Sequence, residues 1–73
     1  MLMNILLQNK KTLHYVEKGG GWTARTENAL LFCTGLEAML FCLDHDFANM
    51  QILGEFADAR MNFTLPVTDL RSD

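Results

Sequence analysis

The first third of the chain alternates between short apolar and polar segments in a pattern typical of a β-hairpin. Residues 2–8 form an apolar run, and residues 12–17 are rich in residues that favour strands. The polar segment at residues 9–11 between them predicts a turn. Three glycines at positions 19–21 end the second predicted strand, because residues without a Cβ atom do not favour an extended backbone.

Two helical segments are predicted after the glycines. Thr26 is a candidate N-cap for a single helical turn over residues 27–30. The clearest local signal is the capping box that begins at Thr34 and ends at Glu37, where the hydroxyl and the carboxylate each satisfy a backbone N–H group. This motif predicts a helix from residue 35 to about residue 45, which is close to the average helix length.

The last part of the chain alternates again and predicts one or two further strands. In residues 50–56, Met50, Ile52 and Phe56 are expected to face the helix. Residues 62–67 also alternate, but Pro66 has no N–H group to donate. This segment is therefore either an edge strand or an extended tail.

These elements predict a single α+β domain. The order is a β-hairpin, a short helical turn, one main helix and then one or two further strands, with the helix packed on one face of a mainly antiparallel sheet. The domain is expected to span residues 1–67, and residues 68–73 are expected to form a frayed C-terminal tail.

The predicted helix has two apolar stripes. The first consists of Leu36, Leu40, Leu43 and Phe47, with Met39 at its edge. The second lies roughly opposite, at spacings of i, i+3, i+4 and i+7, and consists of Ala38, Phe41, Cys42 and His45. Because one sheet covers one stripe, we expect the first stripe to pack on the sheet and the second to form an interface. Alternatively, residues 61–67 fold across the second stripe, with Phe63, Leu65 and Val67 as cover.

Charge is distributed unevenly along the 73 residues, which carry a net charge of −3. Residues 1–25 contain four basic residues and one acidic residue, whereas residues 26–73 contain two basic and eight acidic residues. This balance excludes a general binder of phosphate backbones, which needs a concentrated cationic face. A weak binder of single-stranded nucleic acid or anions remains as an alternative, because basic and aromatic residues occur together near the start. Its candidate residues are Lys10, Lys11, Lys18, Arg25 and Trp22.

The cysteines and histidines do not form a recognisable chemical motif. Cys33, Cys42 and His45 have the spacing C-x8-C-x2-H, and His14 is distant, so the closely spaced ligand pairs of zinc sites are missing. Cys33 precedes a predicted helix N-terminus, where a thiolate is stabilised, but no histidine is placed to act as its base. We therefore predict no metal, no cofactor and no catalytic residues.

The same residues suggest where the protein resides. Both cysteines lie in apolar surroundings, and buried reduced thiols suit a reducing compartment. The N-terminal residues lack the features of a signal peptide, and no apolar run approaches the roughly 18 residues of a membrane span. We predict a cytoplasmic protein with no membrane partner.

Residues 13–43 resemble a loose group of small bacterial and phage-type proteins of unknown function. The resemblance consists of a glycine-rich turn, then Trp22-Thr23, Ala29 and Phe32, followed by a capped helix. It implies a fold but no activity and no site residues. With 49% apolar residues in so short a chain, we predict a non-enzymatic protein-interaction domain, a homodimer through its main helix or the binder of another protein.

Overall fold

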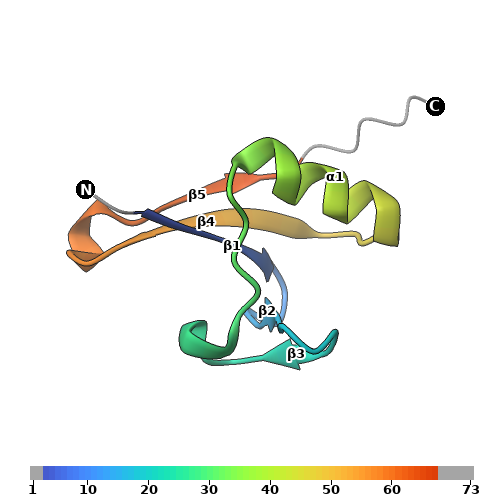
Figure 1. The fold of residues 1–73 in the computed structure, drawn as a ribbon, viewed down its shortest axis with the longest axis horizontal. Helices are drawn as coiled ribbons and strands as arrows, with labels where there is room; N and C mark the ends of the chain where they lie inside the picture. The colour runs from blue at the N-terminus through green and yellow to red at the C-terminus, as the bar shows by residue number, and fades with distance from the viewer. Residues whose placement is uncertain (1–2, 68–73) are drawn as a thin grey trace.

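The computed structural model describes residues 3–67, which fold into one sheet with a helix on one face (Figure 1). The predicted tail, residues 68–73, lies outside the described residues. The elements in chain order are β1 (Met3–Asn9), β2 (Tyr15–Val16), β3 (Trp22–Thr23), the 3-10 helix η1 (Thr26–Asn28), α1 (Gly35–His45), β4 (Met50–Phe56), the 3-10 helix η2 (Ala59–Met61) and β5 (Phe63–Pro66).

The five strands form a single sheet in the order β3-β2-β1-β4-β5, and every neighbouring pair is antiparallel. The central pair is the longest, with Met3 opposite Phe56 and Asn9 opposite Met50. Helix α1 contacts both central strands. The predicted α+β class, with a helix packed on an antiparallel sheet, is therefore confirmed, and residues 63–66 form the edge strand that Pro66 suggested.

The turn between β1 and β2 is longer than the sequence pattern predicted, and β2 is correspondingly shorter. The Asn9 side chain causes this, because its Oδ1 atom accepts hydrogen bonds from the N–H groups of Lys11 (2.8 Å) and Thr12 (3.1 Å). Leu13 closes the turn in the left-handed region, with a φ of 63°. The buried Gln8 side chain then donates to the Leu13 carbonyl at 3.1 Å, which fixes the turn to the sheet.

We expect glycine at position 13 to stabilise the protein more than alanine does. A left-handed backbone costs an L-residue about 1 kcal/mol that glycine does not incur, and the Leu13 side chain is exposed. Leu13→Gly should therefore exceed Leu13→Ala in free energy of unfolding by about 0.5–1 kcal/mol, measured by urea denaturation. The usual order, with alanine more stabilising than glycine, would contradict the assigned turn.

Helix α1 begins and ends as its capping residues dictate. The Thr34 hydroxyl accepts a hydrogen bond from the Glu37 N–H at 3.1 Å, as the capping box predicted. The Glu37 carboxylate reaches back one residue further than expected, to the N–H of Cys33 at 3.4 Å. Asp46 adopts a left-handed conformation with a φ of 56° and ends the helix. The predicted bounds of this helix are confirmed.

The short helical turn before α1 differs from its prediction. Element η1 covers residues 26–28 rather than 27–30, and its N-cap is Arg25, which makes no side-chain capping bond. Thr26 is therefore not the cap. After it, residues 29–32 run extended beside the sheet, where the Leu30 N–H bonds to Val16 and the Phe32 N–H bonds to Ile5.

The main core lies between the sheet and α1, and residues from both predicted stripes reach it. Ala38 and Cys42 of the second stripe are buried there, and Met39 and Phe47 of the first stripe pack against it. Ala38 and Cys42 are fully or almost fully buried, whereas Leu36 and Leu40 are exposed. Small side chains explain this orientation, because they let the helix approach the sheet closely, and bulkier leucines would hold it away. The core residues from the other elements are Ile5, Leu7, Val16, Phe32, Met50 and Ile52.

The opposite face of the sheet carries a second, smaller core that the sequence pattern did not predict. It is formed by Leu6 of β1, Leu53 of β4 and Ala29, with Tyr15 packed against them. Since Ile5 and Leu7 point toward α1, Leu6 must point to the other face. The continuous apolar run at the start of the chain therefore serves two cores.

Strand β5 closes one side of the sheet. The Phe63 ring lies over Gly54 of β4, where an added Cβ atom would come within 2.5 Å of the ring. The Val67 N–H bonds to the Met50 carbonyl at 3.0 Å. The backbone N–H and C=O groups of antiparallel strands alternate in direction. The backbone groups of Phe63 and Leu65 therefore point toward β4, and those of Thr64 and Pro66 point away from the sheet. Residues 63–66 thus extend the sheet. Of the three residues expected as cover, Val67 packs against the core that contains Ala38 and Cys42, whereas Phe63 and Leu65 are exposed.

Candidate protein-binding surface

Three leucines on α1 and on the segment beside it are exposed. Leu36 and Leu40 lie one turn apart on the outer side of the helix and are 63% and 54% exposed. Leu31, on the extended segment beside the helix, is 48% exposed. Full burial of an exposed leucine gives about 1.5–3 kcal/mol, and these half-exposed side chains forgo roughly half of that. An exposed cluster of this kind on a small domain is typical of a protein contact.

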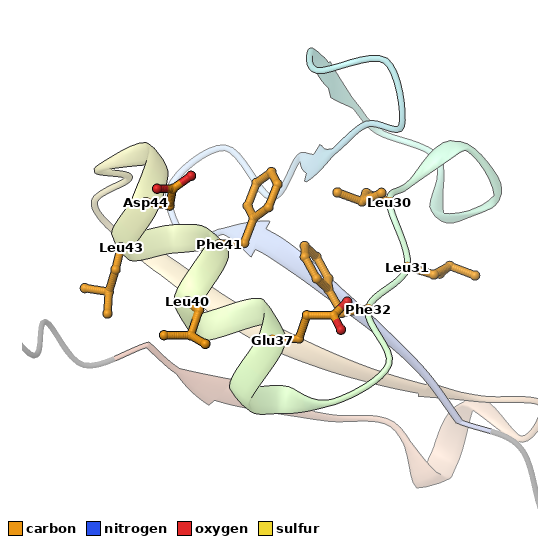
Figure 2. Close-up of a pocket in the computed structure, with 8 residues that line it drawn as sticks. All are labelled: Leu30, Leu31, Phe32, Glu37, Leu40, Phe41, Leu43 and Asp44. Carbon is orange, nitrogen blue, oxygen red and sulfur yellow. The ribbon is translucent and has the colours of Figure 1, made fainter.

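An open groove separates the helix from the extended segment, with a volume of about 740 Å³ (Figure 2). Phe41 of α1 and Leu30 and Phe32 of the segment point into this space. The other lining residues are Leu31, Glu37, Leu40, Leu43 and Asp44. The groove therefore has an apolar floor and two carboxylates on its helical side.

A row of aromatic contacts holds the floor of the groove in place. The rings of Phe32 and Phe41 meet edge to face, with centroids 5.2 Å apart. His45 stacks on Phe41 at 4.0 Å and on Phe47 at 5.4 Å, and the Phe47 ring contacts Trp22 at 5.3 Å. The row joins the helix to β3 and fixes the orientation of Phe41.

The four residues that the sequence predicted as an interface do not share one exposed surface. Ala38 and Cys42 are buried against the sheet, and burial raises the pKa of the Cys42 thiol. Phe41 is half-buried at the groove, and His45 is exposed, with its Nδ1 atom 3.0 Å from the Phe41 carbonyl oxygen. Of the four, Ala38 and Cys42 are therefore inaccessible in this chain, whereas Phe41 and His45 are accessible in part.

The basic residues of the alternative hypothesis lie in the segments around β2 and β3, and the Lys10 N–H bonds to the Asn49 carbonyl beside the end of α1. Lys10 and Lys11 are in the β1–β2 turn and Lys18 is in the β2–β3 turn. Arg25 follows β3, and its guanidinium lies 4.0 Å from the Glu27 carboxylate. Trp22 of β3 is 44% exposed, and its ring lies against Phe47 with centroids 5.3 Å apart.

The part of the chain that the structure describes holds neither a cluster of metal ligands nor a membrane-spanning helix. Within residues 3–67, no three histidine, cysteine or acidic side chains gather where they could hold a metal ion. No helix in this range is long and apolar enough to cross a membrane. Cys33 is a free, exposed thiol, and Cys42 is free and buried.

Comparisons with known proteins add no further constraint. No family model matches the chain, and no curated protein or solved structure is significantly similar to it. The surface around α1 therefore has to be interpreted from its own residues.

The sequence pattern did not predict the groove because its two sides come from different segments, and no local pattern shows that these segments lie side by side. The helical side was visible in the periodicity of residues 35–45, but the other side depends on where the segment at 30–32 lies. The one available signal was the apolar run Leu30-Leu31-Phe32, which a short extended link does not need.

Proposed function

We propose that this protein is a small non-enzymatic protein-interaction domain that self-associates as a homodimer through α1. The observation that carries the proposal is the exposure of Leu36 and Leu40 on the side of the helix that faces away from the sheet. The surface differs from the predicted stripe, but the reason for expecting an interface is the same. The sheet covers one side of an apolar helix and leaves the other in water.

A second copy of the chain suits this surface for two reasons. A twofold axis lets one apolar patch serve both subunits, which is the commonest arrangement of soluble oligomers. The leucines themselves are uncharged, and the acidic residues Glu37 and Asp44 lie on the flank nearest the groove rather than within the stripe. Two copies can thus meet through leucines, with carboxylates at the rim.

Leu40→Glu should convert a concentration-dependent dimer into a folded monomer, as measured by sedimentation equilibrium. A charge at the centre of an apolar contact has no partner and must lose water, whereas in the monomer the same side chain stays in solvent. Circular dichroism should show that the variant keeps its helix.

Leu65→Glu is the matched control, because Leu65 is equally exposed but lies on β5. It should leave the dimer intact. A wild-type protein that stays at 8.3 kDa at high concentration, or a dimer lost equally in both variants, would contradict self-association through α1.

The half-exposed Trp22 favours a second candidate function, weak binding of single-stranded nucleic acid or anions. Lys10, Lys11, Lys18 and Arg25 would supply the charge. Salt-dependent binding of a single-stranded oligonucleotide, accompanied by quenching of Trp22 fluorescence, distinguishes this function from a protein contact.

A further inference from the structure

We propose that the groove between α1 and residues 30–32 binds a basic amphipathic segment of another protein. An apolar side chain of the partner would enter between Phe32, Phe41 and Leu30, and its lysines or arginines would lie beside Glu37 and Asp44. This partner goes beyond self-association, and its binding can be tested whether or not the chain forms a dimer.

The floor of the groove is preorganised for an apolar side chain. Phe32 is buried and is tied to β1 through its N–H bond to Ile5 at 2.9 Å. Phe41 is held between Phe32 on one side and His45 on the other. A partner therefore does not have to order these rings before it binds, which lowers the entropic cost of association.

The charges around the groove favour a partner with a positive charge. Of the eight lining residues, two are acidic and none is basic. The chain from residue 26 to residue 59 contains six acidic residues and no lysine or arginine. The His45 Nδ1 atom lies 3.9 Å from the Asp44 carboxylate, outside the lining of the groove. Because no lysine or arginine lines the groove, the field there attracts a positively charged segment and repels an acidic one.

The spacing of the two carboxylates matches a helical partner. Glu37 and Asp44 are seven residues apart on α1, so their backbones are separated by about 10 Å along the axis. A helix laid along the groove would meet them with two basic residues about two turns apart, and an apolar anchor between them. A second copy seated in the groove itself would bring its own Glu37 and Asp44 to this rim, so the groove is assigned to a basic partner and self-association to the outer side of α1, with Leu40 bordering both.

The test uses a fluorescein-labelled helical peptide with leucines on one face and lysines two turns apart on its flank. Binding to the full chain is followed by fluorescence anisotropy, at concentrations where sedimentation shows a monomer. Saturable binding that weakens with added salt is expected. The E37Q/D44N variant should bind about fivefold more weakly, since each exposed ion pair contributes little alone. Glutamine retains the capping role of Glu37, so the helix is kept.

Matched controls separate a specific groove from general attraction by an acidic protein. The E27Q/D58N variant removes the same charge at two positions outside the groove and should bind as the wild type does. A peptide with glutamates in place of the lysines, and one with serines in place of the leucines, should not bind. The proposal is overturned if the lysine peptide does not bind, if both charge variants weaken it equally, or if either altered peptide binds as well.

Discussion

Ala38→Glu is expected to unfold the protein, whereas the same substitution at Leu36 should leave it folded. Ala38 is 0% exposed and faces the sheet through the main core, where a carboxylate would find neither water nor a partner. Burying an unpaired charge costs several kcal/mol, which is comparable to the roughly 3–5 kcal/mol of stability available to a domain of this size. Far-UV circular dichroism and urea denaturation measure both variants.

The comparison between these two positions tests which side of α1 packs on the sheet. Leu36→Glu places the new charge in solvent and should change the free energy of unfolding by about 0.5 kcal/mol or less. If Leu36→Glu unfolds the chain and Ala38→Glu does not, the helix is turned the other way, and the surface proposed for self-association would instead be part of the core.

Leu7→Ala should remove most of the stability of the domain. Leu7 is fully buried at the centre of β1, between the helix and the rest of the main core. Loss of the buried side chain and the cavity left behind together cost about 3–5 kcal/mol for leucine to alanine in a core. We expect the urea midpoint to fall close to zero or the variant to be unfolded in buffer.

Leu65→Ala provides the reference for this substitution at an exposed position. Leu65 lies on the edge strand with more than half of its surface in water, so its truncation should cost less than about 1 kcal/mol. Similar losses at the two positions would mean that Leu7 is not enclosed between β1 and α1.

Local chemistry predicted the elements of this fold because each signal is confined to a few neighbouring residues. Thr34 caps the main helix through its own hydroxyl, and the start of α1 follows from that bond. Residues 50–56 alternate as a strand, and Pro66 marks the edge of the sheet. The hairpin was predicted as well, although the length of its turn depends on Asn9, whose two hydrogen bonds were not visible as a pattern.

Which side of the helix is buried could not be predicted from periodicity. Both stripes of α1 are apolar, so the spacing of hydrophobic residues is satisfied by either orientation. Residue size decides the matter, since Ala38 and Cys42 allow close packing on the sheet and the longer leucines do not. The candidate groove was not predicted for a related reason. The position of Leu30 and Phe32 beside the helix depends on the path of the chain through the fold, which no local pattern shows.

The outward direction of the Thr64 and Pro66 backbone groups affects whether the edge of the sheet can add strands from other copies at high concentration. A sheet edge recruits further strands through a row of free N–H and C=O groups, which is how fibrous aggregates begin. Along β5, Pro66 has no N–H to offer, so the only outward donor between Phe63 and Pro66 is the amide of Thr64. An incoming strand would find one donor where a ladder needs several. This side of the sheet is therefore a poor template for strand addition, despite the exposed Phe63 and Leu65 side chains beside it.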